Sequence, residues 1–211
     1  MNGIRVPSGD YPVILGPQPT AELLSNLIIE SCTTSAFYSL ESCFLGKLGS
    51  QVASDMLTIV DRGDSPGLVG SKGITCEGLP TGKTELITKG TLTGLLSNDY
   101  ERKRILRDSK AKEKLGVDPL EWQQSIVPRN GFRFGQGGGR NHSSMPSIYP
   151  TNVVIQGEHA LSLQELLKKV SDGIYVGRIW YTYPINGLKA GDFTSTIVGD
   201  SYVIKDGRLA E

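Results

Sequence analysis

A glycine-rich stretch that precedes Lys83 and Thr84 is similar in part to a phosphate-binding loop. It reads Gly78-Leu-Pro-Thr-Gly82, with three residues between its glycines where a P-loop has four. A P-loop binds phosphate through successive backbone N–H groups, and Pro80 removes one of them. We therefore interpret this segment as a hairpin turn and not as a nucleotide site.

Histidine and cysteine side chains, which ligate metals or act as nucleophiles, do not show the spacing of a metal site. His142 and His159 are 17 residues apart, and Cys32, Cys43 and Cys76 form no C-x-x-C pair. The chain also lacks an H-E-x-x-H motif and a G-x-S-x-G nucleophile elbow. These residues predict buried free thiols, no metal ligands and no catalytic residues.

The segment 101–114 carries seven basic and three acidic side chains, with only Ile105, Leu106 and Ala111 apolar. Such a charge run is typical of a solvated helix or loop, and it contains no aromatic side chain on which a base could stack. The whole chain balances 22 Lys and Arg against 22 Asp and Glu. We expect no nucleic-acid partner.

The composition is that of an ordinary soluble protein. The 211 residues are 38% hydrophobic, and a chain of this length buries a core without disulfide staples. Its three cysteines, an odd number, argue against a secreted disulfide framework, and its N-terminus lacks the apolar stretch of a signal peptide. The longest apolar stretch, 23–29, is far shorter than the roughly 20 residues that span a bilayer. We expect a cytoplasmic protein with no membrane contact.

Strands and helices alternate irregularly along the chain. The clearest helix starts at the capping box Ser162-Leu-Gln-Glu165 and ends before Gly173, and another is predicted from Thr20, as its cap, to Thr33. Segment 33–54 is predicted to be irregular, and the glycine-rich segment 129–144 a mobile surface loop. Predicted strands cover 11–15, 57–61, 151–156, 174–182, 192–198 and 201–204. Residues 73–77 and 85–92 are predicted to form a hairpin. The expected fold class is α+β, with a mixed, mostly antiparallel sheet and a few packing helices.

Two late stretches resemble the TldD/PmbA family. Gly173-Ile-Tyr-Val176, Asn186, Gly191-Asp-Phe-Thr-Ser195, Gly199 and Ile204-Lys-Asp-Gly207 follow the family's "GIYV... N... TGDFS... G... IENG" pattern in order and spacing. Shorter matches elsewhere in the chain extend the resemblance over nearly all of residues 8–211. We expect one TldD/PmbA-like domain over 1–211 that lacks the family's N-terminal domain and its last C-terminal segment. The turn at Asp206-Gly207, with four residues after it, also suggests a lost C-terminal continuation.

The resemblance implies a zinc peptidase system, in which TldD carries the metal and PmbA, also called TldE, is its partner. In TldD-like members the first helix carries an H-E-x-x-x-H motif, with the histidines as zinc ligands and the Glu as general base. The matching positions here are Ser25, Asn26 and Glu30. The resemblance therefore implies a non-catalytic PmbA/TldE-like subunit without a cofactor of its own, in a heterodimer whose TldD-like partner holds the zinc.

Such a subunit is expected to hold an unfolded or precursor peptide by β-strand addition, with strands 151–156 and 191–198 as platforms. Asn152, Asp192 and Phe193 are the predicted substrate-binding residues. A structural interpretation stays open, in which Gly191 only turns the chain, Asp192 caps the turn and Phe193 belongs to the core.

Two other functions stay open. One is a self-sufficient metallopeptidase that uses His142, His159 or a cysteine with acidic residues. The other is a regulatory protein-binding module, which the family's older description as modulators of DNA gyrase suggests. Only the basic segment 101–114 offers a physical basis for it.

Overall fold

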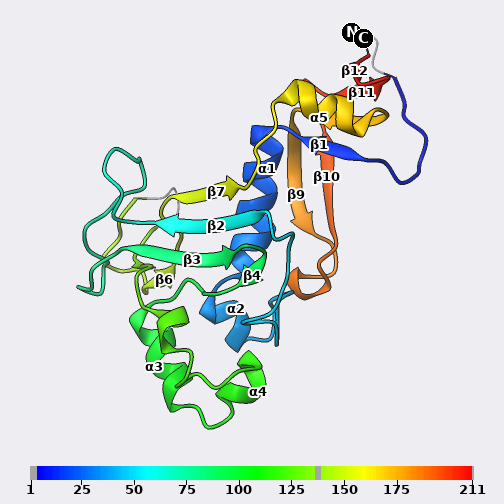
Figure 1. Ribbon diagram of the computed structural model, residues 1–211. Helices are drawn as coiled ribbons and strands as arrows, with labels where there is room; N and C mark the ends of the chain where they lie inside the picture. The colour runs from blue at the N-terminus through cyan, green and yellow to red at the C-terminus, as the bar shows by residue number, and fades with distance from the viewer. Residues whose placement is uncertain (1–3, 136–138, 211) are drawn as a thin grey trace. The chain divides into compact units, whose positions relative to one another are not determined.

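The computed structural model describes residues 4–135 and 139–210, and they divide into two compact units (Figure 1). The terminal unit consists of the described residues of 1–26, 160–183 and 193–211. The central unit consists of those of 27–159 and 184–192. Each unit has its own sheet.

The terminal unit is built on a four-stranded mixed sheet in the order β1-β8-β11-β12. Its strands are β1 (Val13–Leu15), β8 (Gly173–Val176), β11 (Tyr202–Lys205) and β12 (Arg208–Leu209). β1 runs parallel to β8, and the other pairs are antiparallel. Helix α5 (Leu163–Val170) starts at the predicted capping box, and its Leu167 packs on Ile14 and Ile204. The prediction of this helix is confirmed.

A two-stranded ribbon completes this part of the chain. β9 (Ile179–Pro184) and β10 (Phe193–Ile197) lie side by side, and the turn between them contains the short helix η3 (Leu188–Ala190). The prediction of one strand over 174–182 is thus wrong. The segment contains two strands, because β8 ends before Gly177 and β9 begins after it. A Cβ at Gly177 would lie 1.8 Å from the carbonyl oxygen of Asp200, so the chain turns there against another backbone.

The central unit contains an antiparallel sheet in the order β4-β3-β2-β7. Its strands are β4 (Thr91–Leu92), β3 (Lys83–Thr88), β2 (Leu57–Arg62) and β7 (Val153–Gly157). The predicted hairpin of 73–77 with 85–92 is wrong, because β3 pairs with β2 and β4, and Ile74 only bridges to Pro80. The apolar residues of β2 and β3 bury each other, whereas Ile74 is 54% exposed.

The first helix begins earlier than predicted. α1 (Pro17–Leu23) starts after Gly16, with a proline at its first turn, and the Thr20 hydroxyl donates to the Gly16 carbonyl without capping the helix. It continues as the π-helix η1 (Leu24–Ile29). Segment 33–54, predicted to be irregular, contains the short helix α2 (Thr34–Tyr38), whose N-cap is Thr33. The Thr33 N-cap favours this helix, whereas the apolar residues of the segment do not show helical spacing.

The remaining helices and strands of the central unit are short. They are α3 (Asp99–Arg107), α4 (Ala111–Leu115), η2 (Gln123–Ile126), β5 (Gly131–Phe132) and β6 (Ser147–Ile148). Segment 101–114 is not fully solvated, because Ile105 and Ala111 are buried. Segment 129–144 contributes the buried strand β5, and residues 136–138, part of the predicted mobile loop, lie outside the described residues.

The α+β fold class is confirmed, since the sheets are mixed and mostly antiparallel and a few helices accompany them. Within 4–135 and 139–210, no helix has both the length and the apolar character needed to cross a membrane. Burial raises the pKa of the Cys32 thiol, which is in line with the predicted buried thiols. Cys43 and Cys76 are also free, but both are only partly buried.

Candidate functional site

Strand β7 is the edge of the central sheet, because β2 is its only neighbour in the described chain. Arg62 N donates to Asn152 O (2.9 Å), and Glu158 N donates to Met56 O (3.0 Å). These two bonds identify which residues of β7 are hydrogen-bonded to β2. In an antiparallel pair the bonded residues alternate, so the N–H and C=O groups of Val153, Ile155 and Gly157 face away from β2. This edge is a template for an added strand.

A buried carboxylate anchors the chain just before β7. Asp61, at the end of β2, is 1% exposed and accepts hydrogen bonds from Thr151 N (2.7 Å), Thr151 Oγ1 (2.9 Å) and Asn130 Nδ2 (2.7 Å). Asn130 Nδ2 also donates to Tyr149 O (3.0 Å). A buried charge is stable only when hydrogen-bonded in this way, so Asp61 holds the start of the edge strand rigidly.

Asn152 uses its amide to tie a neighbouring loop to the same place. Its Oδ1 accepts from Gly70 N (2.8 Å), and its Nδ2 donates to Arg62 O (2.7 Å) and Ser71 Oγ (3.0 Å). The loop lies so close that a Cβ at Gly70 would meet the Thr151 carbonyl oxygen at 2.2 Å. Asn152 directly precedes β7 and does not lie within the strand, contrary to the predicted strand 151–156, and its amide positions the start of the edge. Peptide contact by Asn152 stays a prediction.

Asp192 and Phe193 have separate surroundings. Asp192 accepts from Asn186 N (3.3 Å) and Asn186 Nδ2 (2.5 Å), and Gly191 has a φ of 77°, so this segment is a hydrogen-bonded turn. Phe193, the first residue of β10, is 45% exposed and is not a core residue. Asp192 belongs to the central unit and Phe193 to the terminal unit. Their role in substrate binding stays a prediction.

The β9–β10 ribbon exposes other large apolar side chains besides Phe193. Each is at least 45% exposed: Trp180, Tyr181, Tyr183 and Ile197. Ile185 N donates to Asp192 O (3.3 Å) and Val198 N to Arg178 O (3.1 Å) at the two ends of the ribbon. The sequence predicts strands in this region but not the exposed aromatic side chains, because a run of neighbouring aromatic residues does not show which of them are buried.

The positions matched to the zinc motif lie in and after the π-helix η1. Ser25 and Asn26 are exposed within η1, and Glu30 follows it. Partial burial raises the pKa of the Glu30 carboxyl above its ordinary value. The first and last positions of the motif are five apart, which is the spacing of π-helical hydrogen bonds, and such turns are frequent at functional sites.

Zinc does not fit two of the three side chains at these positions, and the Glu30 carboxyl is the one zinc-ligand type among them. Zinc is held by thiolates, imidazoles and carboxylates, and the hydroxyl of Ser25 and the amide of Asn26 are none of these. In the part of the chain that the structure describes, no three His, Cys, Asp or Glu side chains gather as a metal site would require. His142 and His159 are both exposed.

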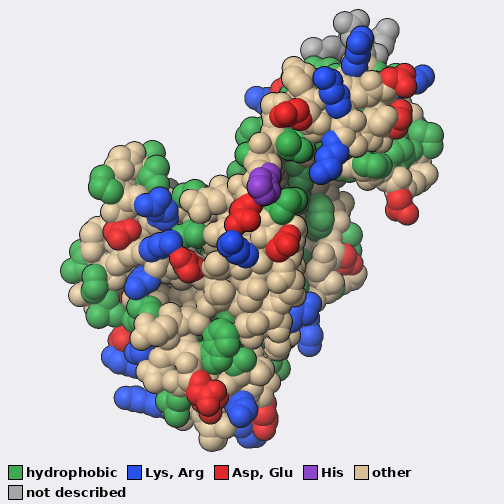
Figure 2. Space-filling view, in the orientation of Figure 1, with side chains coloured by type: hydrophobic (Ala, Val, Ile, Leu, Met, Phe, Trp, Pro, Cys, Tyr) green, Lys and Arg blue, Asp and Glu red, His purple; other side chains and the backbone are tan. Residues whose placement is uncertain are grey.

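Three basic side chains of segment 101–114 pair with carboxylates in the segment or just before it. Lys103 bonds Asp99 (2.5 Å), Arg104 bonds Glu101 (3.1 Å), and Lys114 bonds Asp108 (2.9 Å). Figure 2 shows basic and acidic side chains interspersed over the visible face. Because these basic side chains pair with nearby carboxylates, the physical basis for a charged docking surface in this segment is weak.

Sequence reasoning missed Asp61 and Asn130. A carboxylate at the end of the apolar run 57–61 was the available signal, because such a group needs partners once it is buried. Those partners are 69 and 90 residues away along the chain, so the sequence did not identify them.

Several relatives with similar sequences are metalloproteases by name. A protein named "Metalloprotease" from Methanothermobacter thermautotrophicus is 23% identical over 205 residues, which are 97% of this chain and 38% of that protein. A "Metalloprotease TldD homolog" from Buchnera aphidicola subsp. Acyrthosiphon pisum is 26% identical over 202 residues, 96% of this chain and 36% of that protein. The chain thus spans less than two fifths of the length of these curated relatives.

Solved structures share the fold. TldE from Thermococcus kodakarensis superposes with a TM-score of 0.70 at 22% identity, over 94% of this chain and 39% of that chain. A proposed modulator of DNA gyrase from Bacteroides thetaiotaomicron gives a TM-score of 0.68 at 24% identity, over 98% and 38%.

The sequence profile of the family described as "PmbA/TldA metallopeptidase C-terminal domain" matches residues 8–211. This match covers nearly the whole chain and agrees with the order of the late motifs from Gly173 to Gly207. The chain therefore belongs to the TldD/PmbA family, and residues 8–211 correspond to the family's C-terminal metallopeptidase domain.

Proposed function

We propose that this chain acts as a PmbA/TldE-like, non-catalytic subunit that pairs with a TldD-like metallopeptidase subunit. The observation that carries the proposal is the identity of Ser25 and Asn26 at the positions of a zinc ligand and the general base. A neutral amide cannot accept a proton as a general base does, and a serine hydroxyl is a poor zinc ligand. Hydrolysis therefore takes place on the partner, which holds the zinc.

The chain's own contribution is to bind an extended peptide. Val153, Ile155 and Gly157 offer outward N–H and C=O groups along the β7 edge, and a peptide in extended conformation pairs with them. Main-chain pairing accepts many sequences, which suits unfolded or precursor peptides. Asp61 and Asn152 keep the edge in place and so reduce the entropy lost on binding.

The partner and the compartment follow from the same proposal. A TldD-like subunit is the expected partner, because relatives in this family are named for TldD and TldE. Cys32, Cys43 and Cys76 are free thiols, which fits a reducing compartment, and we propose the cytoplasm.

Two measurements test the non-catalytic role. After dialysis against metal-free buffer and after zinc addition, elemental analysis of the purified chain should find almost no bound zinc. Co-purification with a TldD-like protein should yield a complex whose peptidase activity is abolished by a chelator and restored by zinc. Near-stoichiometric zinc in the chain alone would refute the non-catalytic role, and failure to form any complex would refute the partner role.

A further inference from the structure

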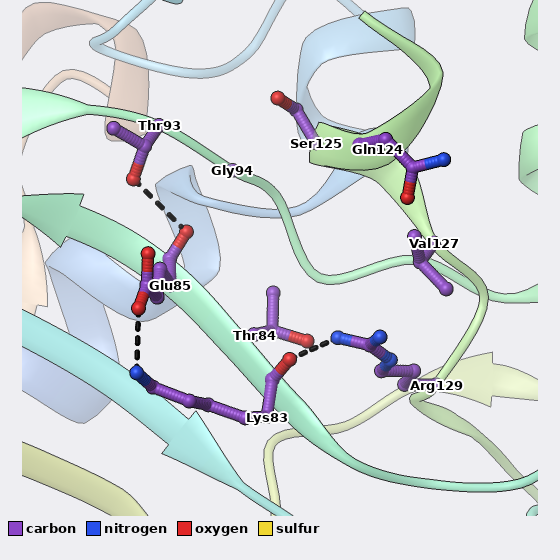
Figure 3. Close-up of a pocket in the computed structure, with 9 residues that line it drawn as sticks. All are labelled: Lys83, Thr84, Glu85, Thr93, Gly94, Gln124, Ser125, Val127 and Arg129. Atoms are coloured by element: carbon purple, nitrogen blue, oxygen red, sulfur yellow. Dashed lines mark hydrogen bonds and ion pairs between the residues drawn. The ribbon is translucent and has the colours of Figure 1, made fainter.

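A hollow of about 290 Å³ lies beside the first half of β3 (Figure 3). One wall is the strand itself, from Lys83 to Glu85, and the opposite wall comes from η2 and the residues after it. Its lining residues are Lys83, Thr84, Glu85, Thr93, Gly94, Gln124, Ser125, Val127 and Arg129. All of them belong to the central unit.

The hollow exists because β3 loses its neighbour halfway along its length. β4 ends at Leu92, and Thr93 N and Gly94 N both donate to Leu86 O (2.9 and 3.3 Å). A Cβ at Gly94 would lie 2.5 Å from Glu85 O, so only glycine allows the chain to pass so close before it leaves β3. The chain then pairs elsewhere, with Leu95 N donating to Ser125 O (2.7 Å).

The backbone of β3 therefore faces the hollow with groups that a strand would otherwise pair. Gly63 N donates to Gly82 O (2.9 Å), which fixes the ladder with β2 so that Lys83 and Glu85 face outward. The Lys83 carbonyl accepts from Arg129 Nη1, and the Glu85 carbonyl accepts from Thr93 Oγ1 (3.2 Å). Within residues 4–135 and 139–210, no turn, loop or cap backbone group bonds to the outward N–H groups of Lys83 and Glu85.

A buried hydroxyl from the strand and a guanidinium from the residues after η2 both line the hollow. Thr84 is 7% exposed, and its Oγ1 has no hydrogen-bond partner within the described chain. Figure 3 shows the Thr84 hydroxyl and the Arg129 guanidinium pointing toward one another beside the strand. Buried polar atoms are normally paired, so an unpartnered hydroxyl at a hollow indicates a ligand or a water.

The charge of the hollow favours an anion. Lys83 Nζ bonds Glu85 Oε1 (2.5 Å), and these two opposite charges offset each other. Arg129 has no carboxylate partner among the ion pairs of residues 4–135 and 139–210, and it bonds a neutral carbonyl instead. A guanidinium retains further N–H donors in a fork that matches a carboxylate.

We propose that this hollow binds the C-terminal carboxylate of a short extended peptide. Arg129 binds the carboxylate, the Thr84 hydroxyl donates to it, and the outward N–H groups of Lys83 and Glu85 pair with the peptide backbone as a strand would. The volume of about 290 Å³ lies just below the roughly 300 to 1,000 Å³ found for small-ligand sites, which limits the ligand to a few residues. This site is separate from the β7 edge, and the proposal does not depend on the function proposed for that edge.

Binding of a capped tripeptide, N-acetyl-trialanine with a free C-terminal carboxylate, tests the proposal. In an NMR titration of the ¹⁵N-labelled chain, the amides of residues 83–85 and 124–129 should shift. The C-terminal amide of the same tripeptide should bind at least about tenfold more weakly, because a hydrogen bond to a charged group contributes more than a neutral one.

Variants locate the binding. Arg129→Gln should weaken binding of the free acid at least about tenfold, and Thr84→Val, nearly isosteric, about two- to tenfold. Arg208→Gln, at an exposed arginine of β12, is the matched control and should bind as the parent chain does. The spectrum of each variant without peptide verifies that it is folded.

Three results would overturn the proposal. Equal affinity for the acid and the amide would exclude carboxylate recognition, and parental affinity in both Arg129→Gln and Thr84→Val would exclude this hollow. Acetate or inorganic phosphate that binds as tightly as the tripeptide would show a simple anion site without strand pairing.

Discussion

At the scale of single residues, Asp61 is the group on which the β7 edge depends. It accepts three hydrogen bonds while almost fully buried, from Asn130 and Thr151. Removal of the carboxylate leaves donors unsatisfied, and each such group costs about 1–3 kcal/mol. Asp61→Ala should lower the free energy of unfolding of the central unit by about 3 kcal/mol or more.

Hydrogen exchange and urea unfolding measure this loss. The amides of Val154 and Gln156, which face β2, should lose protection in Asp61→Ala. Asp55→Ala, which removes an exposed carboxylate, is the control and should change stability by less than about 0.5 kcal/mol. Unchanged protection in Asp61→Ala would refute the anchoring role of Asp61.

The ionisation of Asp108 makes the stability of the folded chain depend on pH. The hydrogen bond from Lys114, together with those from Lys110 N and Tyr38, lowers the Asp108 pKa from 3.8 to about 2. Because the folded-state pKa is depressed, the stabilisation is complete above pH 3.8 and is lost as the pH falls through about 2.

NMR titration of the Asp108 carboxyl carbon measures this pKa. Lys114→Gln should raise it toward 3.8, since the first of the causes is removed. The stability difference between the parent chain and Asp108→Asn should shrink as the pH is lowered from 4 toward 2. A carboxyl that titrates near 3.8 in the parent chain would contradict the hydrogen-bonded geometry.

Among the elements, β7 has backbone N–H groups that alternately face β2 and face outward. A proline substitution can therefore remove an outward N–H group and test strand addition. The N–H of Ile155 faces outward, so Ile155→Pro removes a donor from the free edge and leaves the ladder with β2 intact. Peptide affinity should fall about two- to tenfold, the contribution of one hydrogen bond, and steric exclusion by the ring adds to this loss. Fluorescence anisotropy with a labelled unfolded peptide measures the affinity.

Val154→Pro is the matched control for this element. The N–H of Val154 faces β2, so its loss should destabilise the sheet itself and lower the melting temperature. If Ile155→Pro binds peptide as the parent chain does while folded, the β7 edge is not the peptide platform.

At the scale of the whole molecule, the chain corresponds to one family domain but folds as two compact units. Strands that are distant in the sequence build each unit, with β1 beside β8 in one and β2 beside β7 in the other. The relatives are more than twice as long as this chain, so the proposed pairing with a TldD-like subunit concerns a larger assembly. Zinc content and complex formation are the measurements at this scale.

Features that depend on near neighbours along the chain follow from the sequence alone. The capping box of Ser162 and Glu165 predicts helix α5, and uninterrupted runs of β-branched residues predict β2 and β7, because these signals act within a few residues. The order of the late motifs also carried the family resemblance, which the profile match over 8–211 confirms.

The pairing of strands and the contacts between distant polar groups depend on how the whole chain folds. β3 pairs with β2 and not with 73–77, and Asp61 meets Thr151 from 90 residues away. Such choices depend on which pairing buries more apolar surface and satisfies more hydrogen bonds, and local propensity does not contain that comparison. For the same reason Thr84 and Arg129, far apart in the sequence, were not predicted to line one hollow.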